Sequence, residues 1–241
     1  EAAVKSKPDG YTMALGVTSA LTMNPFIYKS LPYDTFRDFT PVVQLSVNTF
    51  GLMVNPSLPV RSVKELVALA KIHRGQVPYG SFGLGNMTHL AAELFSHETG
   101  VKLLHVPFKG GTPSMVALLS GEVAVMLAPM QAFTPSVRAG TLKLLATCGA
   151  KRWDAFPEVP SVAELGYPGL VMFGWSGIIA PMGTPPAIIN KLQQEVARIL
   201  LVPETREYLT QQGAEPVAST PEQFAAFIKS EADKWSKVIK T

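Results

Sequence analysis

Short apolar stretches alternate with segments of helical periodicity along most of the chain. The apolar stretches have the length of buried strands, and they lie at 11–17, 40–45, 50–54, 76–79, 103–108, 123–127, 142–148 and 171–180. Helical stripes fill several of the intervals between them, with apolar residues three or four positions apart. This order predicts an α/β protein whose sheets are mainly parallel and flanked by helices.

Four of the expected helices have recognisable start signals. Ser62–Glu65 and Thr220–Gln223 are capping boxes, in which two side chains satisfy each other's backbone N–H groups. Thr112 followed by Pro113 predicts an N-cap and a first helical position, for a helix ending at Gly121. Thr184 and Pro185 predict another helix start. The long Pro- and Gly-rich segment 152–169 is expected to be an irregular connection.

The stretch from Tyr79 to Asn86 has the most informative local pattern. It places Ser81 and three glycines at the end of an apolar strand, directly before a helical stripe. Glycine lets a backbone turn sharply and approach a bound group, and a helix N-terminus offers unpaired N–H groups. Strand, glycine-rich turn and helix therefore predict a cradle for an anion, although such a turn can also occur without a ligand.

Nucleotide and hydrolase motifs fit this stretch poorly. Asn86 and Met87 stand where a phosphate-binding Walker loop needs lysine and Ser/Thr, and the glycines are spaced G-x-x-G-x-G rather than G-x-G-x-x-G. Ser81 could serve as a nucleophile, but Tyr79 replaces the first glycine of the G-x-S-x-G elbow. Binding is favoured over catalysis.

A second cradle follows the next expected strand. Lys109, Gly110 and Gly111 precede the helix that begins near Thr112, so a cation accompanies the backbone donors. Lysine can pair with a carboxylate here, or it can be a solvated surface side chain. In open α/β sheets ligands bind beyond the carboxyl ends of strands, where both cradles fall.

Composition limits the function classes further. Only 16% of residues are charged against about 25% in typical domains, and 47% are hydrophobic, so a large core is expected. A net charge of +3 with scattered basic residues does not favour nucleic acid. No apolar run reaches the ~18 residues of a membrane span. The single cysteine, Cys148, lies in an apolar stretch and is expected to be a buried strand residue.

Two further points concern histidines and the N-terminus. His89, Glu93 and His97 are spaced for one helix face, but a rise of roughly 12 Å separates the first from the last, so no metal site is expected. The first nine residues lack the basic start and apolar core of a signal peptide, and they have the pattern of a helix end followed by a turn.

Taken together, the motifs resemble one family over essentially all 241 residues. They occur in a fixed order: Pro8-Asp9-Gly10-Tyr11-Thr12, Tyr79-Gly80-Ser81-x-Gly83-x-Gly85, His89-Leu90-Ala91-x-Glu93-Leu94-Phe95, His105-Val106-Pro107-Phe108-Lys109-Gly110, Trp175-x-Gly177-x-x-Ala180-Pro181-x-Gly183-Thr184-Pro185, Thr220-Pro221-Glu222-Gln223-Phe224 and Glu231-x-x-Lys234-Trp235. The chain resembles the substrate-binding proteins of tripartite tricarboxylate transporters, the Bug (TctC-like) family.

The resemblance implies a two-lobed periplasmic binding protein of the second type, a Venus flytrap without catalysis or cofactor. Its lobes would be 1–54 with 175–241, and 55–174. It implies a small carboxylate held between the lobes and delivered to the membrane permease of the transporter; the alternative is a carboxylate sensor that signals to a partner protein. The ligand-facing residues it implies are Thr18, Ser19, Ala20, Ser81, Gly83, Gly85, Asn86, Met87, Thr88, Lys109, Gly110, Gly111, Gln131 and Phe173.

Two departures from the family pattern are visible. Relatives begin with a strand, a Pro-Gly-Gly loop and a helix before the segment matching Glu1, so the first lobe is expected to lack these elements here. Many relatives carry a Val-Asp pair after the position of Gly121, whereas this chain has Val123-Ala124. The missing aspartate disfavours an amino-acid ligand.

Overall fold

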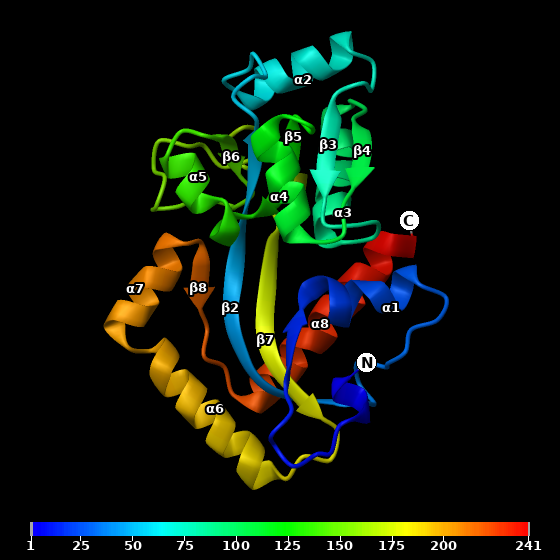
Figure 1. Ribbon diagram of the computed structural model, residues 1–241, viewed down its shortest axis with the longest axis vertical. Coiled ribbons are helices and arrows are strands. Elements are labelled where there is room, and N and C mark those ends of the chain that lie inside the picture. The colour runs from blue at the N-terminus through cyan, green and yellow to red at the C-terminus, as the bar shows by residue number, and fades with distance from the viewer. Residues whose placement is uncertain (1, 241) are drawn as a thin grey trace. The chain divides into compact units, whose positions relative to one another are not determined.

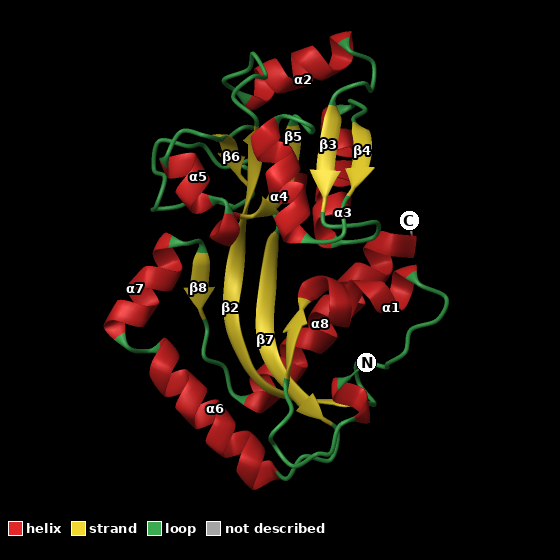
Figure 2. Ribbon diagram, viewed as in Figure 1, coloured by secondary structure: helices red, strands yellow, loops and turns green. Residues whose placement is uncertain are grey.

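The computed structural model describes residues 2–240, which form two compact units (Figure 1). The first consists of Glu1–Val47, Gly174–Thr210 and Ala214–Thr241, and the second of Asn48–Phe173 with Gln211–Gly213. Strands and helices alternate through both (Figure 2), which confirms the α/β class. The lobe boundaries given above stay a prediction.

In the first unit, β1 (Ala14–Val17) pairs antiparallel with β7 (Phe173–Pro181), and β7 neighbours β2 (Phe39–Val54). A short strand, β8 (Ala214–Pro216), also pairs with β2. The helical elements of this unit are η1 (Ala3–Lys5), η2 (Ser19–Met23), α1 (Asn24–Ile27), α6 (Pro186–Leu200), α7 (Pro203–Gln211) and α8 (Pro221–Lys240). Buried Val42 and Val43 of β2 pack with Ile189 of α6, so the apolar stripe of that helix covers the sheet.

In the second unit, the end of β2 pairs antiparallel with both β5 (Val125–Pro129) and β6 (Lys143–Thr147). The next strand, β3 (Pro78–Ser81), runs parallel to β5 and to β4 (Leu104–Pro107). The helical elements of the second unit are α2 (Val63–Ile72), α3 (Met87–Thr99), α4 (Gly111–Ser120), η3 (Met130–Ala132), α5 (Thr134–Arg138) and η4 (Pro168–Leu170). The expectation of mainly parallel sheets therefore needs correction, because the sheet is mixed: β3 is parallel to β4 and β5, whereas the β1–β7, β2–β5 and β2–β6 pairs are antiparallel.

The two strands expected at 40–45 and 50–54 form the single strand β2. The polar residues Ser46 and Asn48, which lie between the two expected strands, are buried within this single strand, as is Gln44. Partners distant in sequence contact this part of the strand: the Gln44 backbone N–H donates to Ser219 Oγ at 2.9 Å, and Ser46 Oγ lies 3.0 Å from Ser176 Oγ. A buried polar residue with a partner does not interrupt a strand.

The start signals are confirmed at Ser62 and Thr220, but α4 and α6 begin without a side-chain cap, and the N-cap of α6 is Pro185. Thr220 and Gln223 exchange hydrogen bonds of 2.9 and 3.2 Å, as the capping box requires. Ser62 Oγ accepts the Glu65 N–H at 3.1 Å, while the Glu65 carboxylate accepts the N–H of Arg61 at 2.7 Å. The α4 helix starts two residues earlier than expected, with Gly110 rather than Thr112 as N-cap.

Cys148 is completely buried, as expected, although it lies just beyond the end of β6. Burial raises the pKa of its thiol to about 12, so the thiolate does not form at physiological pH.

Close packing in the first unit leaves no room at Gly177, where an added Cβ would lie 2.2 Å from the Phe224 ring and 2.8 Å from the Val43 carbonyl oxygen. We expect Gly177→Ala to lower the free energy of unfolding by about 1–3 kcal/mol, the range for overpacked cores, in urea denaturation. Gly16, opposite Gly177 in the β1–β7 register, is the matched control. Its added Cβ meets the flexible end of Leu21, so Gly16→Ala should cost less; equal losses would contradict this account.

Candidate functional site

The glycine-rich turn connects β3 to α3, as its sequence predicts. Gly83 and Gly85 have φ angles of 130° and 72°, a region that favours glycine. A Cβ on Gly83 would also lie 3.3 Å from the Phe108 carbonyl oxygen. The turn therefore requires glycine for its shape, whether or not an anion binds there.

Side chains of the same segment accept most of the hydrogen bonds that the turn can donate. The Gly83 N–H donates to Ser81 Oγ at 3.2 Å, and the Gly85 N–H to His89 Nδ1 at 3.2 Å. The Thr88 N–H donates to Asn86 Oδ1 at 3.1 Å, so Asn86 is the N-cap of α3. The first cradle is thus largely self-capped.

Ser81 is fully buried and its Oγ lies 2.7 Å from His105 Nε2. The proximity of serine and imidazole invites comparison with a hydrolase pair. A nucleophile must meet its substrate, however, and the hydroxyl of Ser81 is enclosed and held in the turn by Gly83. The pair fixes the turn rather than providing an exposed nucleophile.

The second cradle differs from the first because no side chain caps its helix. The N-cap of α4 is Gly110, with a φ of 107° and no side-chain cap hydrogen bond. The N–H groups of Gly111 and Thr112 belong to the first turn, where an α-helix offers no internal partner, and the positive end of the helix dipole lies there as well. This end is electrostatically suited to an anion.

A pocket of about 310 Å³ lies at this helix start. Its lining comes from the β3–α3 turn, from the first residues of α4, and from the segment after β5: Phe82, Gly111, Thr112, Met115, Pro129, Gln131, Ala132 and Phe133. Phe82 closely approaches the helix, since a Cβ added to Gly111 would lie 3.5 Å from the Phe82 ring. Aromatic and aliphatic side chains thus form a wall beside a row of backbone donors.

The pocket contains only two of the residues expected from the sequence, Gly111 and Gln131. Phe82, Thr112, Met115 and Phe133 were missed. Phe82 occupied a variable position of the glycine motif, and Thr112 was assigned to helix capping instead. The signal that could have found Thr112 and Met115 is their position in the first two turns of a helix that begins without a polar N-cap.

The remaining expected residues lie elsewhere, and their contact with a ligand stays a prediction. Ser81, Gly83, Gly85, Asn86, Met87 and Thr88 lie together in the self-capped turn and the helix start. The side chain of Lys109 is exposed and does not line the pocket, and Phe173 is half-buried at the start of β7.

Thr18, Ser19 and Ala20 lie in the first unit, at the start of η2. Thr18 Oγ1 accepts the Trp175 N–H at 2.9 Å, and the Ala20 carbonyl accepts the Tyr33 hydroxyl at 2.5 Å. Thr18 and Ser19 are buried and Ala20 is half-buried. These contacts tie the loop to β7 and to the segment after α1.

The profile of the tripartite tricarboxylate transporter family receptor (TctC) matches residues 1–241. The chain belongs to this family. It is 37% identical to the protein BugT of Bordetella pertussis over 241 residues, which cover 100% of this chain and 74% of BugT.

Solved structures of relatives agree with this fold. The R. palustris protein Rpa4515 with adipate has a TM-score of 0.96 and 35% identity, covering 99% of this chain and 80% of that one. MatC (Rpa3494) from Rhodopseudomonas palustris with bound malate has a TM-score of 0.91 and 28% identity, covering 99% of this chain and 82% of that one. The chain is a solute-binding protein of the TctC/Bug family, not an enzyme.

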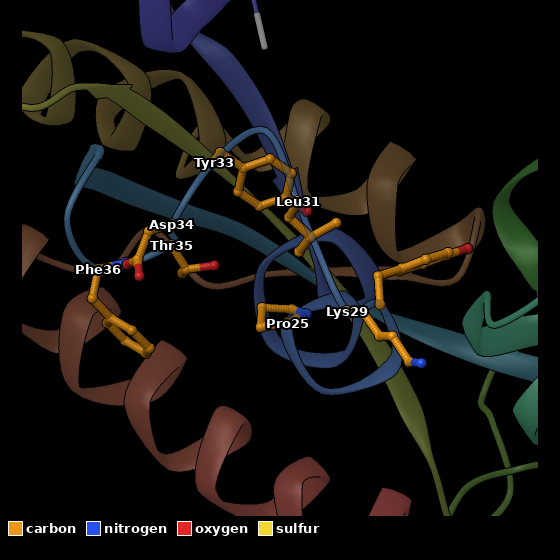
Figure 3. A pocket seen from close by; sticks show the side chains of 8 residues that line it. Pro25, Lys29, Leu31, Tyr33, Asp34, Thr35 and Phe36 are labelled. Carbon is orange, nitrogen blue, oxygen red and sulfur yellow. The ribbon is translucent and has the colours of Figure 1, made fainter.

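The first unit of the receptor has a pocket of its own, about 220 Å³ in volume (Figure 3). Its polar side chains already bond to the backbone: the Thr35 hydroxyl donates to the Leu21 carbonyl at 2.8 Å, and Asp34 Oδ1 accepts the N–H groups of Phe36 and Arg37, each at 2.9 Å. No helix of eight or more residues begins among the residues that line this pocket. These residues are Pro25, Tyr28, Lys29, Leu31, Tyr33, Asp34, Thr35 and Phe36. It is the weaker candidate.

The histidines of α3 each lie near a single carboxylate rather than in a cluster, and these contacts are ion pairs only when the imidazole is protonated. His89 Nε2 lies 3.9 Å from Glu93 Oε1, and His97 Nδ1 lies 3.7 Å from Glu98 Oε1. Within residues 2–240, no three His, Cys, Asp or Glu side chains come together in a way that could hold a metal ion.

None of the helices in the described part of the chain has the length and apolar character needed to cross a membrane.

The self-capped turn gives a stability prediction. Asn86→Ala removes the acceptor of the Thr88 N–H, so we expect the free energy of unfolding to fall by about 1 kcal/mol, as for other lost N-caps. Asn86→Asp keeps an oxygen acceptor at the start of α3 and should retain most of the stability. Urea denaturation of both variants checks this, and equal losses would show that the cap contributes nothing.

Proposed function

We propose that this protein captures a small organic acid in the periplasm and delivers it to the membrane permease of a tripartite tricarboxylate-type transporter. The main support for the proposal is the pocket of the second unit, where the start of α4, which has no side-chain cap, lies beside Phe82 and Phe133. Membership of the receptor family supports the transport role and the location.

The carboxylate would meet the start of α4. The N–H groups of Gly111 and Thr112 can donate to its oxygens, and the exposed Thr112 hydroxyl can add a third bond. A negative charge at a helix N-terminus gains about 0.3–1 kcal/mol, and up to ~2 kcal/mol where the site is partly buried. Backbone donors of this kind recognise any carboxylate, so they provide affinity rather than selectivity.

The rest of the acid would lie against the apolar wall. Phe82 and Met115 are half-buried and Phe133 is fully buried, so a hydrocarbon segment covering them is removed from water. The pocket volume of about 310 Å³ is at the lower end of the ~300–1,000 Å³ typical of ligand pockets. We therefore favour short-chain acids of the size that the two relatives hold, adipate and malate.

Selectivity would come from the exposed end of the pocket. Gln131 is the exposed amide on the lining, and its side chain offers both a donor and an acceptor. A second carboxylate or a hydroxyl on the ligand can pair with it. A dicarboxylate is accordingly favoured over a monocarboxylate of equal length.

A thermal-shift screen of mono-, di- and tricarboxylates tests the proposal. A ligand at one hundred times its Kd stabilises the folded state by about 2.7 kcal/mol, which raises the Tm by roughly 5–10 °C for a protein of this size. Dicarboxylates should give the largest shifts. If no acid raises the Tm at millimolar concentration, the proposed function is wrong.

A charge placed at the helix start separates binding from folding. We expect Thr112→Glu to leave the Tm of the free protein unchanged or higher, because an acidic side chain suits the first helical turn. The same carboxylate occupies the proposed anion site and repels the ligand, so adipate affinity measured by calorimetry should fall by about tenfold or more.

Thr112→Gln is the matched control, since it has nearly the same size without the charge. It should reduce adipate affinity much less than Thr112→Glu does. Equal affinities for the two variants would mean that the carboxylate does not bind at the start of α4.

A further inference from the structure

Three aromatic rings stack beneath the glycine-rich turn. The Tyr79 and His105 rings have centroids 4.8 Å apart and an interplanar angle of 14°, and the His105 and His89 rings are 4.2 Å apart at 15°. Tyr79 comes from β3, His105 from the neighbouring β4, and His89 from α3. The stack therefore links two strands to the helix that follows the turn.

The groups facing the stack favour neutral imidazoles. Desolvation lowers the pKa of His89, with Glu93 on the same helix acting in the opposite direction. Desolvation also lowers the pKa of His105, and the neighbouring His89 lowers it further, while Glu93 opposes. Glu93 is itself engaged, because its Oε1 accepts the Tyr79 hydroxyl at 2.6 Å. Two parallel imidazoles 4.2 Å apart also disfavour a charge on both.

Each histidine holds one part of the turn, but the two hydrogen bonds respond differently to a proton. His105 Nε2 pairs with Ser81 Oγ at 2.7 Å, and a hydroxyl can accept as well as donate, so this bond survives protonation with its direction fixed. His89 Nδ1 accepts the Gly85 N–H at 3.2 Å, and a backbone N–H can only donate. Protonation at Nδ1 would place two donors face to face.

The turn that His89 holds also provides Phe82, the aromatic wall of the pocket. We infer that His89 is a positioning residue for the binding site: together with the Thr88 hydroxyl, which accepts the Phe82 N–H, it helps to hold the turn that carries Phe82 while its Nδ1 is an unprotonated hydrogen-bond acceptor. This inference rests on the proposed function, because it assumes that the acid binds in that pocket.

The direction of the pH effect follows from the folded state. Because the pKa of His89 is lowered on folding, its contribution is fully present above the ordinary imidazole value of about 6.5 and is lost as the pH falls towards the folded pKa. A bound carboxylate would attract a protonated His89. However, none of the residues that line the pocket belongs to the ring stack, so the two charges would not be in contact and solvent ions would screen the attraction. Loss of the Gly85–His89 hydrogen bond acts directly on the turn, so ligand affinity should fall as the pH is lowered.

The first test needs no ligand. In NMR spectra of the free protein, the Gly85 amide shift should follow the ring titration of His89 with the same midpoint. If the His89 ring titrates while the Gly85 amide stays constant, the inference is overturned. This measurement decides the role of His89 even if no acid binds at all.

The second test measures adipate affinity by calorimetry at pH 7.5 and pH 5.5. The wild type should bind more weakly at pH 5.5, by up to about tenfold for each pKa unit that separates free from bound His89. His89→Gln supplies an amide oxygen that accepts the Gly85 N–H but does not titrate. Relative to its own affinity at pH 7.5, this variant should lose less affinity on acidification than the wild type does.

Two further variants complete the comparison. His105→Gln should keep the acid response, since the bond to Ser81 is not the sensitive one, and His97→Gln, at an exposed position on the same helix, should behave as the wild type. Protonation of adipate itself affects the measured affinity of every variant in the same way. The test therefore compares the pH dependence of adipate affinity between the wild type and each variant. Identical pH profiles for the wild type and His89→Gln would overturn the inference, whereas no adipate binding at either pH would contradict the proposed function instead.

Discussion

The requirement that first-turn N–H groups of a helix find acceptors organises the second unit of this protein. Two consecutive strand–turn–helix segments differ in this respect: side chains supply acceptors at the start of α3 but not at the start of α4. At α3, Asn86 accepts the Thr88 N–H, and Ser81 and His89 accept the N–H groups of Gly83 and Gly85. At α4, the N-cap is a glycine and no side chain closes the first turn. The second helix start is therefore the one with donors to offer.

In the proposed site, the self-capped turn would contribute to binding in an indirect way. Its hydrogen bonds stay within the segment, and they fix the place of Phe82 beside α4. The Phe82 N–H donates to Thr88 Oγ1 at 2.8 Å, so the residue that forms the pocket wall is attached to the start of α3. One glycine-rich turn supplies shape and the other supplies donors. Two structures of similar fold hold different small acids, adipate and malate, and a division between shape and donors suits that variation.

Local sequence signals predicted the features that depend on local chemistry. The capping boxes at Ser62 and Thr220, the sharp turn at Gly83 and Gly85, and the burial of Cys148 each depend on a few neighbouring residues. The continuity of β2 was missed because residues distant in sequence supply partners for it, Ser219 for the Gln44 backbone N–H and Ser176 for the Ser46 hydroxyl. The pocket was missed for the same reason: Phe82, Thr112 and Phe133 come together only through packing of β3, α4 and the segment after β5. The motif also drew attention to Ser81, whose hydroxyl is buried and already bonded.

The central claim is that an acid binds at the start of α4 rather than at the glycine-rich turn before α3. A crystal structure of this protein with bound adipate tests it most directly. The account predicts one carboxylate within hydrogen-bond distance of the Gly111 and Thr112 N–H groups, with the methylene chain against Phe82 and the Gly85 N–H still bonded to His89. A carboxylate that takes the Gly85 or Thr88 N–H from its side-chain acceptor, with no contact to α4, would contradict it.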